Sequence, residues 1–179
     1  MMRQKADFKM THIEDPPLEV LEMPYYGKDL SMIIFLPKAL EGLPELETQL
    51  TAKRLGSWLD TLNETTPNET WVFLPRFTTS QSFDLKPMLK SLGMRSAFER
   101  AADFSGMDGT KNLFISDVLH QAVVEVNEAG TEVAAATMIA VKTMSQSYHF
   151  NANHPFLFLI RDNGSGSILF LGRIVDPTK

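Results

Sequence analysis

The run Glu128-Ala129-Gly130-Thr131-Glu132-Val133-Ala134-Ala135-Ala136-Thr137 carries the strongest structural signal of this sequence. From Thr131 to Val141 all the β-branched residues fall on alternate positions, whereas the charges of Glu132 and Lys142 fall on the other phase. A period of two is typical of a half-buried strand. The polar residues that follow are typical of a loop. The pattern therefore predicts a segment that forms a loop in one state and a strand in another.

The composition is that of an ordinary globular protein. The chain has 179 residues, 44% of them hydrophobic, and a formal net charge of -5. The net charge is negative and no stripe of basic side chains is present to neutralise phosphates, so no nucleic-acid partner is expected. The apolar runs are shorter than the roughly 20 residues that cross a bilayer, so no membrane partner is expected. The sequence contains no cysteine, which excludes disulfides and thiol catalysis, and no cofactor is expected.

Strand patterns dominate both ends of the sequence and helical patterns lie between them, which predicts an α+β fold. The almost wholly apolar run Ser31–Leu36 predicts a strand buried on both faces, and Tyr26–Asp29 predicts a hairpin turn before it. Leucines and a tryptophan recur at helical spacing between Leu46 and Leu62. The expected strands are 7–13, 18–25, 30–37, 71–77 (with a bend at Pro75) and 113–127, and the expected helices are 44–63 and one that opens at 82–84 and ends at Gly93.

Several further motifs resemble one known family in their order along the chain. They are Met1-Met2, Leu30–Pro37, Leu74-Pro75-Arg76-Phe77, Leu92-Gly93-Met94, Phe150–Arg161 and Ile168–Pro177. Together with the run at 128–137, which resembles the hinge of a reactive-centre loop, they make the chain similar to the serpins from end to end. The resemblance covers about the C-terminal half of a serpin. It implies that residues 1–179 form a single, partial serpin domain with its loop at about 128–149.

The resemblance implies an inhibitor of serine proteases and not an enzyme. In serpins the protease attacks the exposed loop as a suicide substrate, and the cleaved loop then inserts into a sheet as a new strand. Insertion requires a face without bulky charge or proline, because an unpaired charge there would be buried. The implied hinge residues are Glu128, Gly130, Thr131, Glu132, Val133, Ala134, Ala135, Ala136 and Thr137.

The family's usual spacing also implies the position of the cleaved bond. Counting forward from Gly130 and back from Pro155 gives the same residue, so the reactive bond is expected between Met144 and Ser145. A methionine suits the apolar primary pocket of an elastase-like or chymotrypsin-like serine protease. Lys142 is the alternative reactive residue, and it would recruit a trypsin-like protease.

A charge pair and a histidine are implied to gate the insertion. Arg76 and Glu128 match serpin positions that form a charge pair near the place where insertion begins, and the alternative is two solvated charges. His120 matches a histidine in the region where the central strands separate, and protonation would then tune opening with pH. The alternative interpretation is that His120 is an ordinary core or surface histidine.

Other functions remain open at the level of the sequence. A truncated or non-inhibitory serpin would act as a carrier, a chaperone or an interaction fragment, and would be cleaved without trapping the protease. Association of one molecule's loop with another's sheet is a further expectation, because an uncovered strand edge invites pairing with a second chain. The expected location is extracellular, with the cytoplasm as the alternative.

Overall fold

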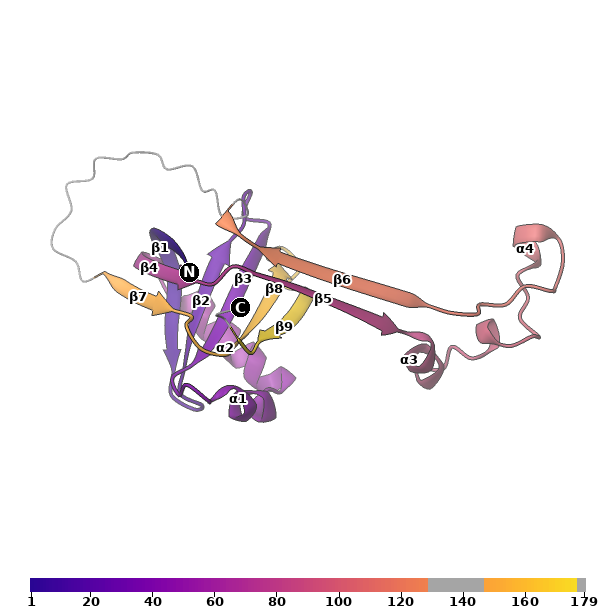
Figure 1. Ribbon diagram of the computed structural model, residues 1–179, viewed down its shortest axis with the longest axis horizontal. Helices are drawn as coiled ribbons and strands as arrows, with labels where there is room; N and C mark the ends of the chain where they lie inside the picture. Colours follow the sequence, from indigo (N-terminus) through magenta and orange to yellow (C-terminus); the bar gives the residue numbers. More distant parts are fainter. Residues whose placement is uncertain (129–146, 177–179) are drawn as a thin grey trace. The chain divides into compact units, whose positions relative to one another are not determined.

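The computed structural model of the protein describes residues 1–128 and 147–176. The chain forms two compact units (Figure 1). The first contains Met1–Phe77 and Val126–Lys179, and the second contains Thr78–Glu125. The sheet on which helices pack belongs to the first unit.

Within the described residues, the first unit is built on a seven-stranded sheet of order β7-β4-β1-β2-β3-β8-β9. Neighbouring strands are antiparallel except β4 and β7, which are parallel. The strands are β1 (Met2–Ile13), β2 (Leu18–Pro24), β3 (Leu30–Pro37), β4 (Asn68–Leu74), β7 (Tyr148–Asn151), β8 (Phe156–Asp162) and β9 (Ile168–Ile174).

Strand β1 joins the two parts of this sheet because it changes partner along its length. Met2–Phe8 pair with β4, and Lys9–Ile13 pair with β2. The inward-facing Phe8, at the point of change, is buried. One continuous strand therefore connects β4 and β7 with the core strands β2, β3 and β8.

The strand prediction is confirmed most closely at β2 and β3. The two strands form an antiparallel hairpin whose turn is closed by the Tyr25 N–H bonded to the Leu30 carbonyl at 2.9 Å. Gly27 and Lys28 both have positive φ in this turn, of 82° and 63°. The residues from Ser31 to Pro37 are all buried, as expected for a strand covered on both faces.

Two helices cover one face of the sheet, where Figure 1 shows them together. They are α1 (Leu43–Gln49) and α2 (Ala52–Glu64). Leu46, Trp58 and Leu62 form a core with the buried residues of β2, β3 and β8. The rings of Phe35 and Trp58 lie 6.0 Å apart. This packing fixes the centre of the sheet.

The prediction of one helix over 44–63 was wrong in one respect, since the helix is interrupted at Leu50 and Thr51. Thr51 has an extended backbone, and its side chain accepts a hydrogen bond from the Arg54 N–H at 3.2 Å. Threonine is favoured as an N-cap because its oxygen satisfies an otherwise unpaired N–H of the first turn. The helical spacing of the leucines continues across the break, so it gives no sign of the cap.

The second unit contains a two-stranded sheet of β5 (Phe77–Asp84) and β6 (Leu119–Val126) within the described residues. Three short helical turns lie between the strands in sequence: α3 (Lys86–Ser91), the 3-10 turn η1 (Ser96–Phe98) and α4 (Ser105–Asp108). Strand β4 ends before Pro75 and β5 begins at Phe77, so the predicted bend at this proline is confirmed.

Two boundaries in the second unit differ from the prediction. Residues 82–84 end β5 and do not open a helix; α3 begins at Lys86, whose N–H donates to the Asp84 carboxylate at 3.0 Å. Strand β6 begins at Leu119 instead of residue 113. The chain before it carries Asp117, a residue type that is depleted in strands. Gly93 follows α3 with a φ of 102°, as expected for a C-cap.

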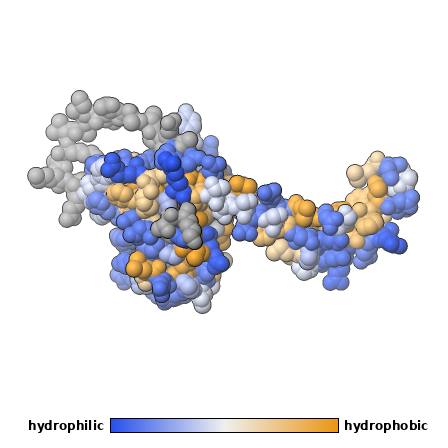
Figure 2. Space-filling view, in the orientation of Figure 1, coloured by the Kyte–Doolittle hydropathy of each residue, from blue (hydrophilic) through white to orange (hydrophobic). Residues whose placement is uncertain are grey.

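Large apolar side chains remain at the surface of both units, and Figure 2 shows patches of them on one face of the molecule. In the first unit they cluster on β9, where Ile168, Leu169, Phe170 and Leu171 are exposed. In the second unit they include Met88, Leu92 and Met107 on the helical turns and Leu119 and Val123 on β6. Contiguous apolar surface of this kind marks places where other protein surface packs.

Strand β9 packs so closely on β8 that Gly172 has no room for a side chain. A Cβ atom there would lie 2.6 Å from Phe158 Cζ, and Phe158 is buried. We therefore expect Gly172→Ala to lower the free energy of unfolding by about 1–3 kcal/mol, as overpacking does in cores. Urea unfolding followed by circular dichroism measures this change.

Gly56→Ala is the matched control for this substitution. Gly56 lies within α2, and a Cβ there would meet nothing within 4 Å. Because alanine favours the helix, this variant should be more stable by about 0.5–1 kcal/mol. Equal stabilities for Gly172→Ala and the unmodified chain would contradict the close packing of β9 on Phe158.

Candidate functional site

The structure places both ends of the predicted loop in the first unit. Glu128 is the last described residue before the loop and Ser147 the first after it. Strand β7 begins directly afterwards, at Tyr148. The other residues predicted to act in the loop lie outside the described residues: Gly130, Thr131, Glu132, Val133, Ala134, Ala135, Ala136, Thr137, Lys142, Met144 and Ser145.

The entry to the loop carries an ion pair between Glu128 and Arg76. Arg76 Nε donates to Glu128 Oε1 at 2.7 Å, and Arg76 Nη2 contacts the same oxygen. The backbone next to Arg76 is anchored, because the ring of the following residue, Phe77, packs on the rings of Phe156 and Phe158. The ring centroids are 6.1 and 5.4 Å apart. Both charged side chains are more than half exposed, so their attraction is screened by solvent.

The Arg76 guanidinium holds the pKa of the Glu128 carboxyl below its ordinary value, chiefly through the hydrogen bonds that it donates. A partner lowers the pKa of a carboxyl by stabilising its ionised form. The pair is therefore fully formed at pH values above the ordinary pKa of the carboxyl, and it is lost as the pH falls through the lowered pKa. The pair is therefore present at neutral pH and opens only in acid. Its role as a gate stays a prediction.

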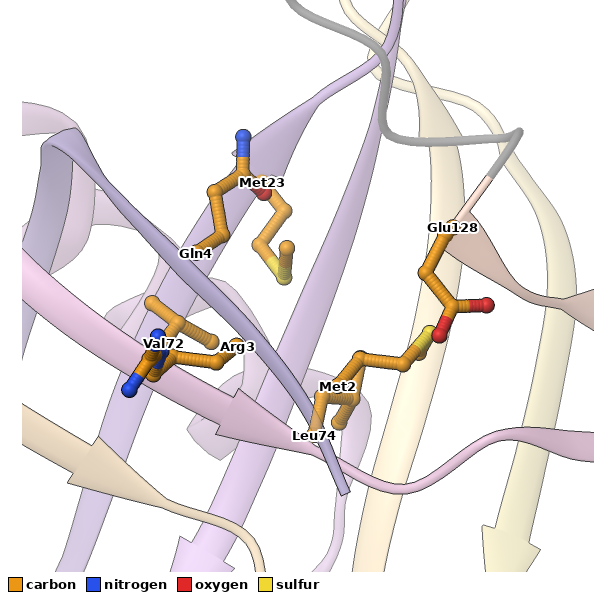
Figure 3. A pocket seen from close by; sticks show the side chains of 7 residues that line it. All are labelled: Met2, Arg3, Gln4, Met23, Val72, Leu74 and Glu128. Atoms are coloured by element: carbon orange, nitrogen blue, oxygen red, sulfur yellow. The ribbon is translucent and has the colours of Figure 1, made fainter.

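A small pocket lies beside Glu128 in the first unit (Figure 3). Its cavity has a volume of about 110 Å³ and is lined by Met2, Arg3, Gln4, Met23, Val72, Leu74 and Glu128. The Met2 side chain extends toward the Glu128 carboxylate in Figure 3. This volume is below the roughly 300 Å³ of a typical small-molecule site. The pocket is too small for such a ligand, and it places the apolar side chains of Met2, Met23, Val72 and Leu74 beside the entry to the loop.

The exit from the loop is fixed by contacts that the sequence did not predict. The Ser147 hydroxyl donates to Glu69 Oε1 at 3.1 Å, and Lys5 Nζ lies 2.9 Å from the same oxygen. Beyond Ser147, β7 pairs with β4 from Tyr148 opposite Thr70 to Asn151 opposite Phe73. The spacing in sequence between Ser147 and Glu69 is 78 residues, so only the folded sheet brings them together.

Two histidines, His120 and His154, lie in different units of the chain. His120 lies exposed on β6 in the second unit, and its gating role stays a prediction. His154 is partly buried, with Nε2 2.6 Å from the Pro37 carbonyl oxygen and Nδ1 2.9 Å from Asn153 Oδ1. It thus joins the start of β8 to the end of β3.

Among residues 1–128 and 147–176, no three histidine or carboxylate side chains gather closely enough to hold a metal ion. In the same part of the chain, no helix has the length and apolarity to cross a membrane.

Comparison with known proteins identifies similar sequences over the whole chain. The model of the family described as Serpin (serine protease inhibitor) matches residues 1–177. Serpin B3 from Homo sapiens is 47% identical over 182 residues, with 99% of this chain and 46% of that protein covered. The leukocyte elastase inhibitor from Equus caballus is 46% identical, with 99% and 48% covered. The chain spans about half the length of the curated relatives it matches.

Solved structures resemble the fold over the same extent. Uncleaved ovalbumin has a TM-score of 0.80 at 32% identity, covering 98% of this chain and 47% of that chain. Maspin has a TM-score of 0.74 at 31% identity, covering 98% and 47%. The α+β fold class predicted from the sequence is confirmed.

The ion pair between Arg76 and Glu128 leads to a prediction about the pKa of the Glu128 carboxyl. In a ¹³C NMR titration, the Glu128 carboxyl is expected to titrate below the ordinary range of a glutamate. In Arg76→Gln the pKa of Glu128 should rise toward that range, because the guanidinium hydrogen bonds that lower it most are then lost. Lys111→Gln is the matched control, since Lys111 pairs with Asp103 in the second unit. An unchanged Glu128 titration in Arg76→Gln would contradict the pairing.

Proposed function

Since the chain belongs to the serpin family and has the serpin fold, we propose that it carries the reactive part of a serine protease inhibitor. The observation that supports this most directly is the anchoring of the segment between Glu128 and Ser147 at both ends. Arg76 holds the entry and Glu69 the exit, on the same unit. Because the chain spans about half of its relatives' length, the proposal is made for a protein of the relatives' full length that contains this sequence, hereafter the longer protein.

In the proposed reaction the segment is attacked as a substrate. The serine of the protease attacks the carbonyl carbon of Met144, and the bond to the Ser145 nitrogen breaks. The amine leaves with a proton from the histidine of the protease, and Met144 stays bound to the serine as an ester. Hydrolysis of this ester would release the enzyme. Displacing the ester by about 1 Å from the oxyanion hole slows hydrolysis strongly, and insertion of the cleaved segment supplies the displacement.

The hinge composition supports insertion. The residues on the inserting face, Thr131, Val133, Ala135 and Thr137, are uncharged and none is bulky. Each can be buried without leaving a charge unpaired. The Arg76–Glu128 pair lies at the entry and would open as the hinge moves, with His120 as a second element of the gate. The inhibitor forms its complex through the chemistry of the protease and catalyses no reaction itself.

The partner proposed is a serine protease with an apolar primary pocket. Met144 suits such a pocket, and one relative at 46% identity is named for inhibition of leukocyte elastase. A trypsin-like protease is the partner if Lys142 is the reactive residue. The loop could also enter the sheet of a second molecule, which would give self-association.

Insertion needs more sheet than the described residues provide. In the part of the chain that the structure describes, β5 and β6 form a sheet by themselves and leave Leu119 and Val123 exposed. We propose that the rest of the longer protein covers these side chains and completes the sheet. The second candidate function follows from the same observation: the chain alone would be cleaved as bait and trap nothing, as an interaction fragment or a non-inhibitory carrier would be.

The first test is incubation of the 179-residue chain with a chymotrypsin-like and an elastase-like protease. We expect cleavage after Met144, detected by intact mass spectrometry as a peptide that begins at Ser145. We expect no SDS-stable adduct from this chain, and an adduct from the longer protein. Met144→Asp should remove the cleavage by both proteases, because a carboxylate does not suit an apolar pocket, whereas Lys142→Ala should leave it. Cleavage after Lys142 by a trypsin-like protease, kept in Met144→Asp and lost in Lys142→Ala, would move the reactive bond to Lys142. An adduct with the chain alone would overturn the need for further strands.

The second test changes the hinge in the longer protein. Thr131→Arg places a charge on the inserting face, so the ester should hydrolyse before insertion is complete. The number of inhibitor molecules consumed per protease inactivated should rise at least severalfold, with the cleavage rate little changed. Glu132→Arg is the matched control, because residue 132 lies on the other phase and stays solvated. An unchanged stoichiometry in Thr131→Arg would refute trapping by insertion.

A further inference from the structure

We propose that Glu69 is a positioning residue that clamps the exit of the loop through Ser147 and so sets how the Met144–Ser145 bond is presented to the protease. This inference rests on the proposed function and adds to it a residue pair far from the hinge. The Ser147 hydroxyl and Lys5 Nζ converge on one oxygen of Glu69, at 3.1 and 2.9 Å. Three segments of chain, at β1, β4 and the loop exit, therefore meet at a single carboxylate.

The carboxylate is well placed to hold a hydroxyl. Its side chain is only 15% exposed, so it has lost much of its contact with solvent, and its attraction to Lys5 is less screened than that of a surface pair. Lys5 is itself held, since its Nζ lies 5.1 Å from the centroid of the Trp71 ring. A hydrogen bond to an ionised acceptor is stronger than one between neutral groups.

In the part of the chain that the structure describes, the beginning of strand β7 is paired on one side, with β4. It is an edge strand of the described sheet and is paired over four residue positions, the first of which is Tyr148. The His149 ring stacks on Phe73 at 6.4 Å, and Phe150 is fully buried, so the middle of the strand is secured. Ser147 precedes the ladder, and its hydroxyl is the contact that extends the fixed backbone toward the loop.

The clamp places a fixed point close behind the bond that is cut. The residues from Met144 to Ser147 span at most roughly 10 Å when extended. A protease binds several residues on each side of the cleaved bond in an extended form, and a substrate already held near that form loses less conformational entropy on binding. The clamp should therefore act on substrate binding (KM) more than on the chemical step (kcat).

The test measures the kinetics of cleavage after Met144 by a chymotrypsin-like protease in the 179-residue chain. Ser147→Ala and Glu69→Ala should each raise KM about two- to tenfold with kcat little changed, as expected for one partly exposed hydrogen bond. Ser147→Thr, which keeps the hydroxyl, should restore KM. The Ser147→Ala/Glu69→Ala double variant should match Glu69→Ala, because the serine then has no acceptor to lose.

Glu19→Ala is the matched control. Glu19 is a partly exposed glutamate of the same sheet that faces His12 at 3.6 Å, and it lies on β2, away from the loop exit. Its substitution should leave KM unchanged. A KM that is also unchanged in Ser147→Ala and Glu69→Ala, while cleavage after Met144 proceeds, would overturn the clamp and leave the proposed function standing.

A second measurement tests the clamp without the protease. Hydrogen–deuterium exchange of the Tyr148–Asn151 amides should be faster in Ser147→Ala than in the unmodified chain, because fraying of β7 begins at its unfixed end. If the unmodified chain is not cleaved after Met144, the proposed function fails, and this exchange still decides the clamp. Equal exchange rates in the two proteins would overturn it.

Discussion

The packing of α1 and α2 on β2, β3 and β8 is the interaction on which the rest of the first unit depends. Burial of Val20, Phe35 and Leu159 beneath Leu46, Trp58 and Leu62 holds three strands of the sheet in one register. A shift of one residue would turn the alternate side chains to the opposite face. The positions of the outer strands depend on this centre, because β1 pairs with β2 along one part of its length and with β4 along the other.

Both ends of the loop depend on β4 and the residues after it. Strand β4 contributes Glu69 to the exit, and Arg76, which follows it, contributes to the entry. The two contacts differ in character: Arg76 and Glu128 are well exposed, whereas Glu69 is shielded. An exposed pair is weak and easily opened, and a shielded one is more persistent. This asymmetry suits the proposed insertion, in which the entry would move while the exit stays in place.

The sequence predicts the parts of this structure that depend on local patterns. The alternation and apolar run of β2 and β3, and the turn between them, need no knowledge of distant residues. The sequence did not predict the start of α2. Thr51 caps this helix with one side-chain hydrogen bond, and the helical spacing of the leucines continues on both sides of it. Strand β7 and the Ser147–Glu69 contact were missed because they exist only through parallel pairing with a strand 78 residues away. The Arg76–Glu128 pair was expected only from the resemblance to serpins, since nothing local in the sequence joins the two residues.

The position of β8 between β3 and β9 has a consequence for the molecule once its loop is cut. Hydrolysis of one peptide bond after Met144 would divide the chain into two polypeptides, the shorter of which carries β7, β8 and β9. That peptide would stay attached by the antiparallel ladder between β3 and β8 and by the burial of Phe156, Phe158 and Leu159. The nicked protein would behave as a tight non-covalent heterodimer, intact on a sizing column and separated only by denaturant.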